Sequence, residues 1–110
     1  MSDVVRVLTE ARDLISDPKR WTQGAYARDA HGRQTYWGDP AAVCWCASGA
    51  ISKATKLTPA QSAMNRDLVD QAQAELDSAI DHYGVFTFND SRTHKEVLEM
   101  FDRAIAGKEA

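Results

Sequence analysis

The stretch A42-V-C-W-C-A-S-G-A-I51 places two cysteines on either side of a tryptophan and follows them with small residues. Asp39-Pro40 comes just before it, and an aspartate followed by proline is typical of a helix N-terminus. We therefore predict one helix from Pro40 to about Ala54. Two positions along a helix correspond to a rotation of about 200°, so the cysteines would face opposite sides and could not bind one metal ion together.

This predicted helix also indicates what surrounds each side chain. Cys44 and Cys46 would lie beyond its first turn, where the helix dipole does little to form a thiolate, at the edges of an apolar arc. We interpret them as buried, reduced small hydrophobes. Trp45 would face the other way, beside Gly49. We expect an aromatic hairpin to cover Trp45, with Gly49 permitting close backbone approach; the alternative is a surface for a ligand or partner.

Length and composition limit the class of protein. A chain of 110 residues with 44% hydrophobic content fits one domain, residues 1–110, with a single core. Its net charge of −3 gives no basic field for a nucleic acid or an anionic membrane. No segment approaches the roughly 20 apolar residues needed to span a bilayer, and two cysteines are too few for a disulfide framework. We therefore expect a soluble, cytoplasmic protein.

Apolar periodicity and capping signals predict the remaining elements. Residues 21–37 lose the helical period and read as a β-hairpin that turns at Asp29-Ala30-His31-Gly32. Helices are predicted for residues 3–16, for residues 59–84 after a capping box at Thr58-Pro59-Ala60-Gln61, and for residues 93–106 after a second capping box at Thr93 and Glu96. The helix at 59–84 has a possible bend at Asn65. Between the last two helices we predict a strand at 85–88 and a loop at 89–92. The predicted fold class is α+β, with about four helices around a small antiparallel sheet.

Two kinds of site can be assembled from these residues. A binding surface would use Trp21, Gln23, Trp45, Gly49, Asn89, Asp90 and His94. A cysteine hydrolase would use Cys46, or Cys44, as nucleophile and His94 as base, with Asn89 or Asp90 orienting the base and Gln23 donating to the oxyanion. Against the hydrolase stand the mid-helix cysteines. His94 can equally be a structural residue that ties the segment at Asn89 and Asp90 to the last helix.

Charged residues offer weaker alternatives. Basic and aromatic residues alternate near the hairpin and could stack single-stranded bases: Lys19, Arg20, Arg28 and Arg33 with Trp21, Tyr26 and Tyr36. An acidic stripe on the third helix is interpreted as a solvated face that could contact a basic partner: Asp67, Asp70, Asp77 and Asp81. There is no glycine-rich phosphate loop and no metal-ligand spacing, so we expect no cofactor and no metal.

Taken together, the segments W21-T-Q-G-A-Y-A-R-D-A-H-G32, A42-V-C-W-C-A-S-G-A-I51 and F88-N-D-S-R-T-H-K-E-V-L98 resemble an uncharacterised family of small bacterial and phage proteins, a domain of unknown function. The similarity covers about residues 8–106. The pattern includes Trp21, Gln23, Gly24, Asp29, Gly32, Trp45, Cys46, Gly49, Ala50, Asn89, Asp90, Thr93 and His94. The resemblance implies no activity, cofactor or partner. Our leading interpretation is therefore a small binding or accessory protein, with the cysteine hydrolase and a weak single-strand binder as alternatives.

Overall fold

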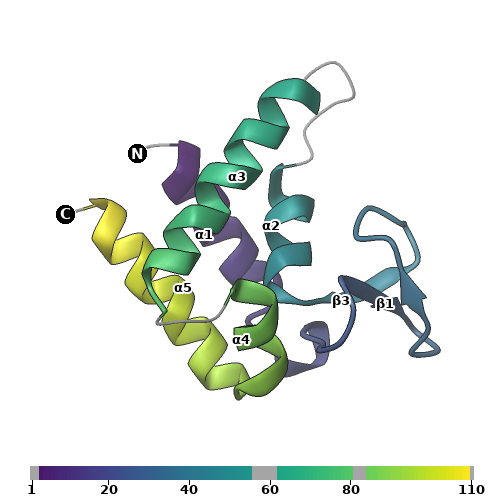
Figure 1. Cartoon of the computed structure of the whole chain (residues 1–110). Helices are drawn as coiled ribbons and strands as arrows, with labels where there is room; N and C mark the ends of the chain where they lie inside the picture. The colour runs from purple at the N-terminus through teal and green to yellow at the C-terminus, as the bar shows by residue number, and fades with distance from the viewer. Residues whose placement is uncertain (1–2, 56–61, 81–83, 110) are drawn as a thin grey trace.

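The computed structural model describes residues 3–55, 62–80 and 84–109, and within them the fold is α+β (Figure 1). Five α-helices, one short 3₁₀ turn and a three-stranded antiparallel sheet are present in these ranges. The elements are α1 (Asp3–Leu14), η1 (Pro18–Arg20), β1 (Ala27–Asp29), β2 (Gln34–Thr35), β3 (Ala42–Trp45), α2 (Ala47–Thr55), α3 (Ser62–Ser78), α4 (Val85–Ser91) and α5 (His94–Glu109). The predicted fold class is thus confirmed, with one more helix than expected.

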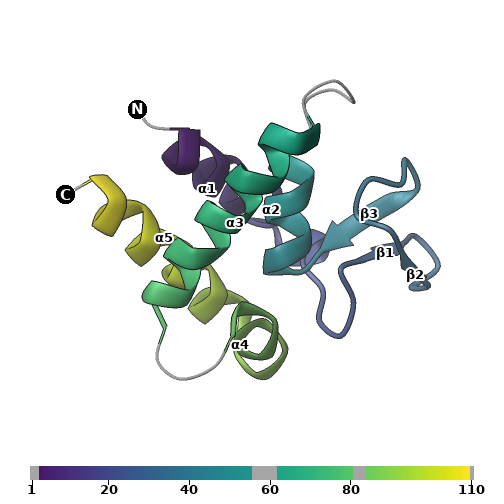
Figure 2. The ribbon, with the colours of Figure 1, turned by 45° about the horizontal axis from the view of Figure 1, so that its top comes forward.

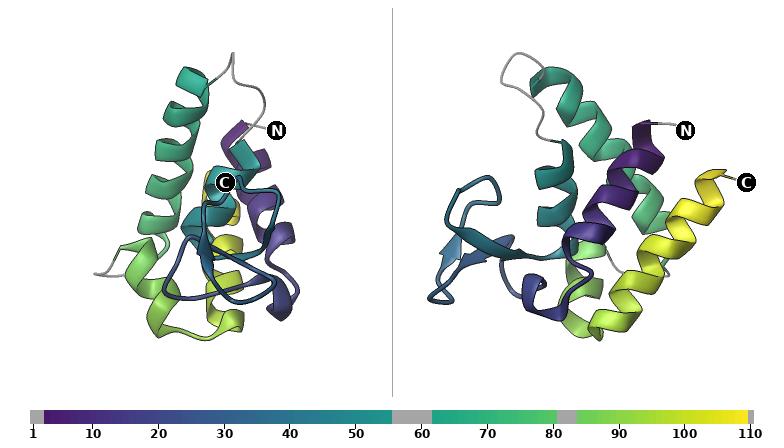
Figure 3. Two further views of the ribbon diagram at one scale, coloured as in Figure 1. Left: turned by 90° about the vertical axis from the view of Figure 1, so that its right-hand side faces the viewer. Right: turned by 180° about the vertical axis from the view of Figure 1, so that it is seen from behind.

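Helix α1 lies at the centre of the helical layer and contacts α2, α3 and α5. Its apolar residues recur at helical spacing, so Val4, Val7, Leu8 and Ala11 all point into the core. The core continues through Phe101 of α5. The sheet lies on the far side of α2 from α5, as Figures 1 and 2 show and the rear view in Figure 3 confirms.

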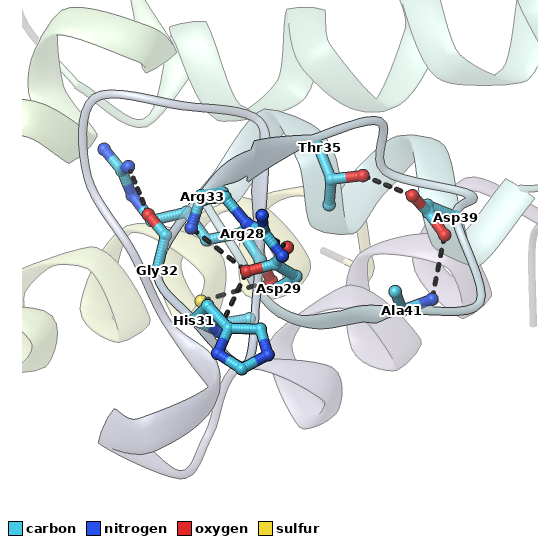
Figure 4. Close-up of polar contacts among 9 residues, drawn as sticks. Arg28, Asp29, His31, Gly32, Arg33, Thr35, Asp39 and Ala41 are labelled. Atoms are coloured by element: carbon cyan, nitrogen blue, oxygen red, sulfur yellow. Dashed lines mark hydrogen bonds and ion pairs between the residues drawn. The ribbon is translucent and has the colours of Figure 1, made fainter.

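The sheet has the strand order β2-β1-β3, with both pairs antiparallel. Its β1–β2 hairpin turns where the sequence predicts, because the Asp29 carboxylate accepts hydrogen bonds from the backbone N–H groups of His31 (2.9 Å) and Arg33 (3.1 Å) (Figure 4). Gly32 in this turn has φ +78°, a conformation that favours glycine. The second turn is held by Asp39, which accepts from the Thr35 hydroxyl and the Ala41 N–H.

The single helix predicted from Pro40 to Ala54 is wrong in its first half. Residues Ala42–Trp45 form strand β3, and α2 begins only at Ala47. Asp39 caps a turn rather than a helix, and β3 pairs with β1 so that Trp45 lies opposite Ala27. A valine and a tryptophan in this stretch suit a strand, and the ladder partner outweighs the weak helix signal of Asp39-Pro40.

The strand predicted at residues 85–88 is also wrong, since Val85–Ser91 forms α4. Its buried residues are Val85, Phe88 and Asn89, three and four positions apart, as on one face of a helix. Asn89 therefore lies on a helix rather than in the predicted loop. A run of four residues is too short for the two periods to be told apart from sequence.

The other predicted helices are present, but the predicted end of the third helix at Gly84 is wrong, because α3 ends at Ser78 and Gly84 precedes the first turn of α4. Helix α3 runs without a break through Asn65, and the predicted capping box at 58–61 lies outside the described residues. At α5 the predicted capping box is confirmed, because the Thr93 N–H donates to Glu96 Oε1 (3.1 Å) and the Glu96 N–H donates to the Thr93 hydroxyl (3.2 Å). None of the described helices is long and apolar enough to cross a membrane.

Candidate functional site

Asn89 is the hub of a buried hydrogen-bond network that joins three distant segments. Its Oδ1 accepts from Trp21 Nε1 (2.7 Å) and from the Ala47 N–H (3.0 Å), while its Nδ2 donates to the Thr22 carbonyl (3.0 Å). The side chain is fully buried, so each of these bonds replaces one to water. Asn89 thereby ties α4 to the segment before the hairpin and to the first turn of α2.

Other predicted site residues belong to the same network. Gln23 Nε2 donates to the Asn89 carbonyl (3.0 Å), and Asp90 Oδ1 accepts from the Gly24 N–H (2.9 Å). His94 Nε2 lies 2.6 Å from the Ile15 carbonyl, which can only accept, so Nε2 carries the proton; the His94 ring packs on Trp21 at 5.3 Å between centroids. These polar groups bond one another rather than face an empty site.

Cys46 is the N-cap residue of α2, which corrects the prediction that both thiols lie beyond the first turn of a helix. Its Sγ accepts from the Gly49 N–H (3.3 Å), three residues on. This position would favour a thiolate, but the side chain is fully buried. Burial is the larger effect and raises the pKa of the Cys46 thiol, against the hydrogen bonds from Gly49 and Ser48 that lower it.

Gly49 and Trp45, which we expected to lie against the hairpin, do so, but Trp45 is part of a strand and not of a helix. A Cβ built on Gly49 would lie 2.1 Å from the Tyr26 carbonyl oxygen, so the close backbone approach expected there is confirmed. Trp45 does not turn outward from a helix: it ends β3, is 6% exposed and donates from Nε1 to the Trp37 carbonyl (2.9 Å). Trp45 is covered within the chain, not left open for a partner.

The arrangement gives the hydrolase constellation little support. Among the described residues, no hydrogen bond joins the Cys46 sulfur to His94, whose Nε2 bonds to Ile15 instead. Gln23, the expected oxyanion donor, is occupied by the carbonyls of Asn89 and Arg92. A nucleophile must also reach its substrate, and Cys46 is buried with a raised pKa. Cys44 is partly exposed but lies in the sheet, next to Arg28.

A second region is open to solvent and hollow. The hairpin and α2 enclose a pocket of about 460 Å³, which we call the hairpin pocket. Its lining includes three aromatic and three polar side chains: Tyr26, Tyr36, Trp37, Gln34, Thr35 and Ser52. Among the residues that the structure describes, no acidic or basic side chain lines it. Tyr26 and Tyr36 are 51% and 56% exposed, so large apolar surfaces face solvent at this place.

The sequence reasoning identified the aromatic residues of the hairpin but missed the polar lining of this pocket. Gln34 and Thr35 form the two-residue strand β2, and Ser52 comes from the middle of α2. The packing of Gly49 against the backbone of Tyr26, beside the hydrogen bond from the Cys46 N–H to the Tyr26 carbonyl, holds α2 against the hairpin. The signal available from sequence was the adjacent pair Tyr36 and Trp37, whose rings lie 4.8 Å apart.

The profile of a family described as "Family of unknown function (DUF6197)" matches residues 1–107. The chain belongs to this family. The match confirms the resemblance to an uncharacterised domain family that the sequence indicated. No curated protein and no solved structure gives a significant match to the chain.

In this DUF6197 chain, two of the basic residues proposed to contact a single strand, Arg28 and Arg33, are engaged within the hairpin. The Arg28 guanidinium donates to the Thr22 hydroxyl and to the carbonyls of Gln23 and Gly32, and Arg33 pairs with Asp29 at 3.3 Å. Trp21 packs on His94 rather than beside Tyr26 and Tyr36. Across the described ranges, no group of three or more His, Cys, Asp or Glu side chains is placed to hold a metal ion.

Proposed function

We propose that this DUF6197 chain is a small binding module of bacterial or phage origin, and that the hairpin pocket is its ligand site. The observation that carries the proposal is an open pocket of about 460 Å³ with aromatic walls and a few polar groups. Ligand sites are commonly about 300–1,000 Å³, mostly apolar, with a small number of polar groups that orient the ligand.

The surroundings of the pocket favour a preformed site. Asp29 and Asp39 fix the two turns that flank β2, and Gly49 seats α2 directly against the hairpin backbone. A site held in this way loses little conformational entropy when a ligand binds. The network around Asn89 supports the hairpin from its other end, which is why we assign Trp21, Gln23, Asn89 and His94 a structural role rather than a ligand-contacting one.

A fragment screen observed by protein NMR tests the proposal. Small uncharged fragments should shift the amide signals of the hairpin and of α2 near Ser52, and binding should saturate. Ser52→Leu would narrow the pocket from the side of α2 and should weaken these shifts, whereas Ser78→Leu, at the exposed end of α3, should leave them unchanged. Fragments that bind only elsewhere, or equally well to the Ser52→Leu variant, would contradict the proposal.

A further inference from the structure

We propose that the hairpin pocket accepts a nucleobase, as a planar ring stacked on its tyrosines. This inference rests on the binding function proposed above and names the class of ligand. Tyr26 packs edge to face against Phe86, with 5.3 Å between ring centroids, and still exposes 51% of its surface. Tyr36 is held against Trp37 and exposes 56%. Aromatic faces held in place but open to solvent are what a base needs for stacking.

The polar groups of the pocket match the edge of a base. Within the described part of the chain, the side-chain amide of Gln34 makes no hydrogen bond, so its oxygen and its NH₂ group are both available at the lining. Such an amide can bond a donor and an acceptor that lie side by side, as on adenine. The Thr35 hydroxyl gives its proton to Asp39 and can only accept, while Ser52 can donate or accept.

The absence of charged side chains among the described lining residues narrows the class of ligand further. The described residues of the lining include no cationic side chain, so a phosphate or carboxylate held by them would lose its hydration without a compensating partner. The part of the ligand that contacts these residues is therefore uncharged. A sugar ring is uncharged too, but it presents several hydroxyl groups, and satisfying them would require the phenol hydroxyls of Tyr26 and Tyr36 as well as the three polar side chains, one of which has its proton committed to Asp39. A flat base with one polar edge fits the lining better.

The test is an NMR titration of the full chain with adenosine, uridine, methyl glucoside and a hexanucleotide of single-stranded DNA. We expect both nucleosides to shift the hairpin signals and the glucoside to leave them unchanged. A hexanucleotide that binds more than tenfold tighter than the nucleosides identifies a single strand as the source of the base; equal affinity identifies a free nucleoside. Binding of the glucoside as tightly as adenosine would overturn the inference.

Two variants assign any binding to the pocket. Tyr36→Ala should weaken adenosine binding by about tenfold, because one stacking surface is lost. Val43→Ala, also exposed but outside the pocket, should leave it unchanged. Circular dichroism checks that each variant is folded. If uncharged fragments occupy the pocket but neither nucleosides nor the hexanucleotide do, the nucleobase assignment is wrong and the binding function stands. If nothing occupies the pocket, both fail.

Discussion

Substituting Gly49 tests the contact that builds the hairpin pocket. A Cβ at this position would lie 2.1 Å from the Tyr26 carbonyl oxygen, a distance that real Cβ contacts do not reach. That oxygen is a backbone atom and accepts the Cys46 N–H (3.2 Å), so it cannot rotate away as a side chain would. We therefore expect Gly49→Ala to displace the hairpin from α2.

The expected loss of unfolding free energy in Gly49→Ala follows from opposing contributions. Overpacking costs about 1–3 kcal/mol, and weakening the bond from Cys46 to Tyr26 costs about 1 kcal/mol more. Alanine is the better helix former and returns about 1 kcal/mol. The net loss of unfolding free energy is about 1–3 kcal/mol, which lowers the melting temperature of a chain of this size by about 4 °C or more.

Urea unfolding followed by circular dichroism measures this loss, and Gly107→Ala is the matched control. Gly107 is also helical, but a Cβ there would meet nothing within 4 Å, so its substitution should be neutral or stabilise by up to about 1 kcal/mol. The reasoning is refuted if Gly49→Ala is as stable as Gly107→Ala. Amide shifts confined to the hairpin and α2 would identify the displaced contact.

Three further predictions concern the network, the thiols and the turns. Asn89→Ala should cost about 3–5 kcal/mol in urea unfolding, because it leaves the Trp21 and Ala47 N–H groups without their acceptor; a loss below about 1 kcal/mol would contradict the assigned role. In native protein, iodoacetamide should modify Cys46 in a Cys44→Ser variant more slowly than Cys44 in a Cys46→Ser variant, with equal rates in urea; rapid, pH-dependent labelling of Cys46 would restore the hydrolase alternative. The pKa values of Asp29 and Asp39 are lowered, chiefly by the Arg33 N–H and the Thr35 hydroxyl respectively, so their contribution to stability is present above the ordinary carboxyl pKa and lost as pH falls through the lowered values. The protection of the hairpin amides, measured as their exchange rate relative to the intrinsic rate at the same pH, should therefore fall below about pH 4, and unchanged protection at pH 3 would show that these turns do not depend on the two carboxylates.

Some properties of the candidate site could be predicted from sequence and others could not. Four of the residues chosen from sequence as one binding surface do lie together: Trp21, Gln23, Asn89 and His94. Their roles could not be read from sequence, because a polar side chain looks the same whether it bonds a ligand or a backbone carbonyl. The hairpin pocket was missed because its polar lining comes from short elements whose proximity depends on packing at Gly49.

The sequence by itself determined the elements whose signals are local. The apolar period of α1, the turn at Asp29 and the capping box at Thr93 each require only residues within a few positions of one another. Only the tertiary structure decided the secondary structure of two segments, Ala42–Trp45 and Val85–Ser91. The first is a strand because β1, many residues earlier, supplies its hydrogen bonds, and the second is a helix because one face of it is buried. The tertiary structure also decided the protonation of the Cys46 thiol, because its position at the helix N-terminus favours a thiolate while burial in the core raises its pKa.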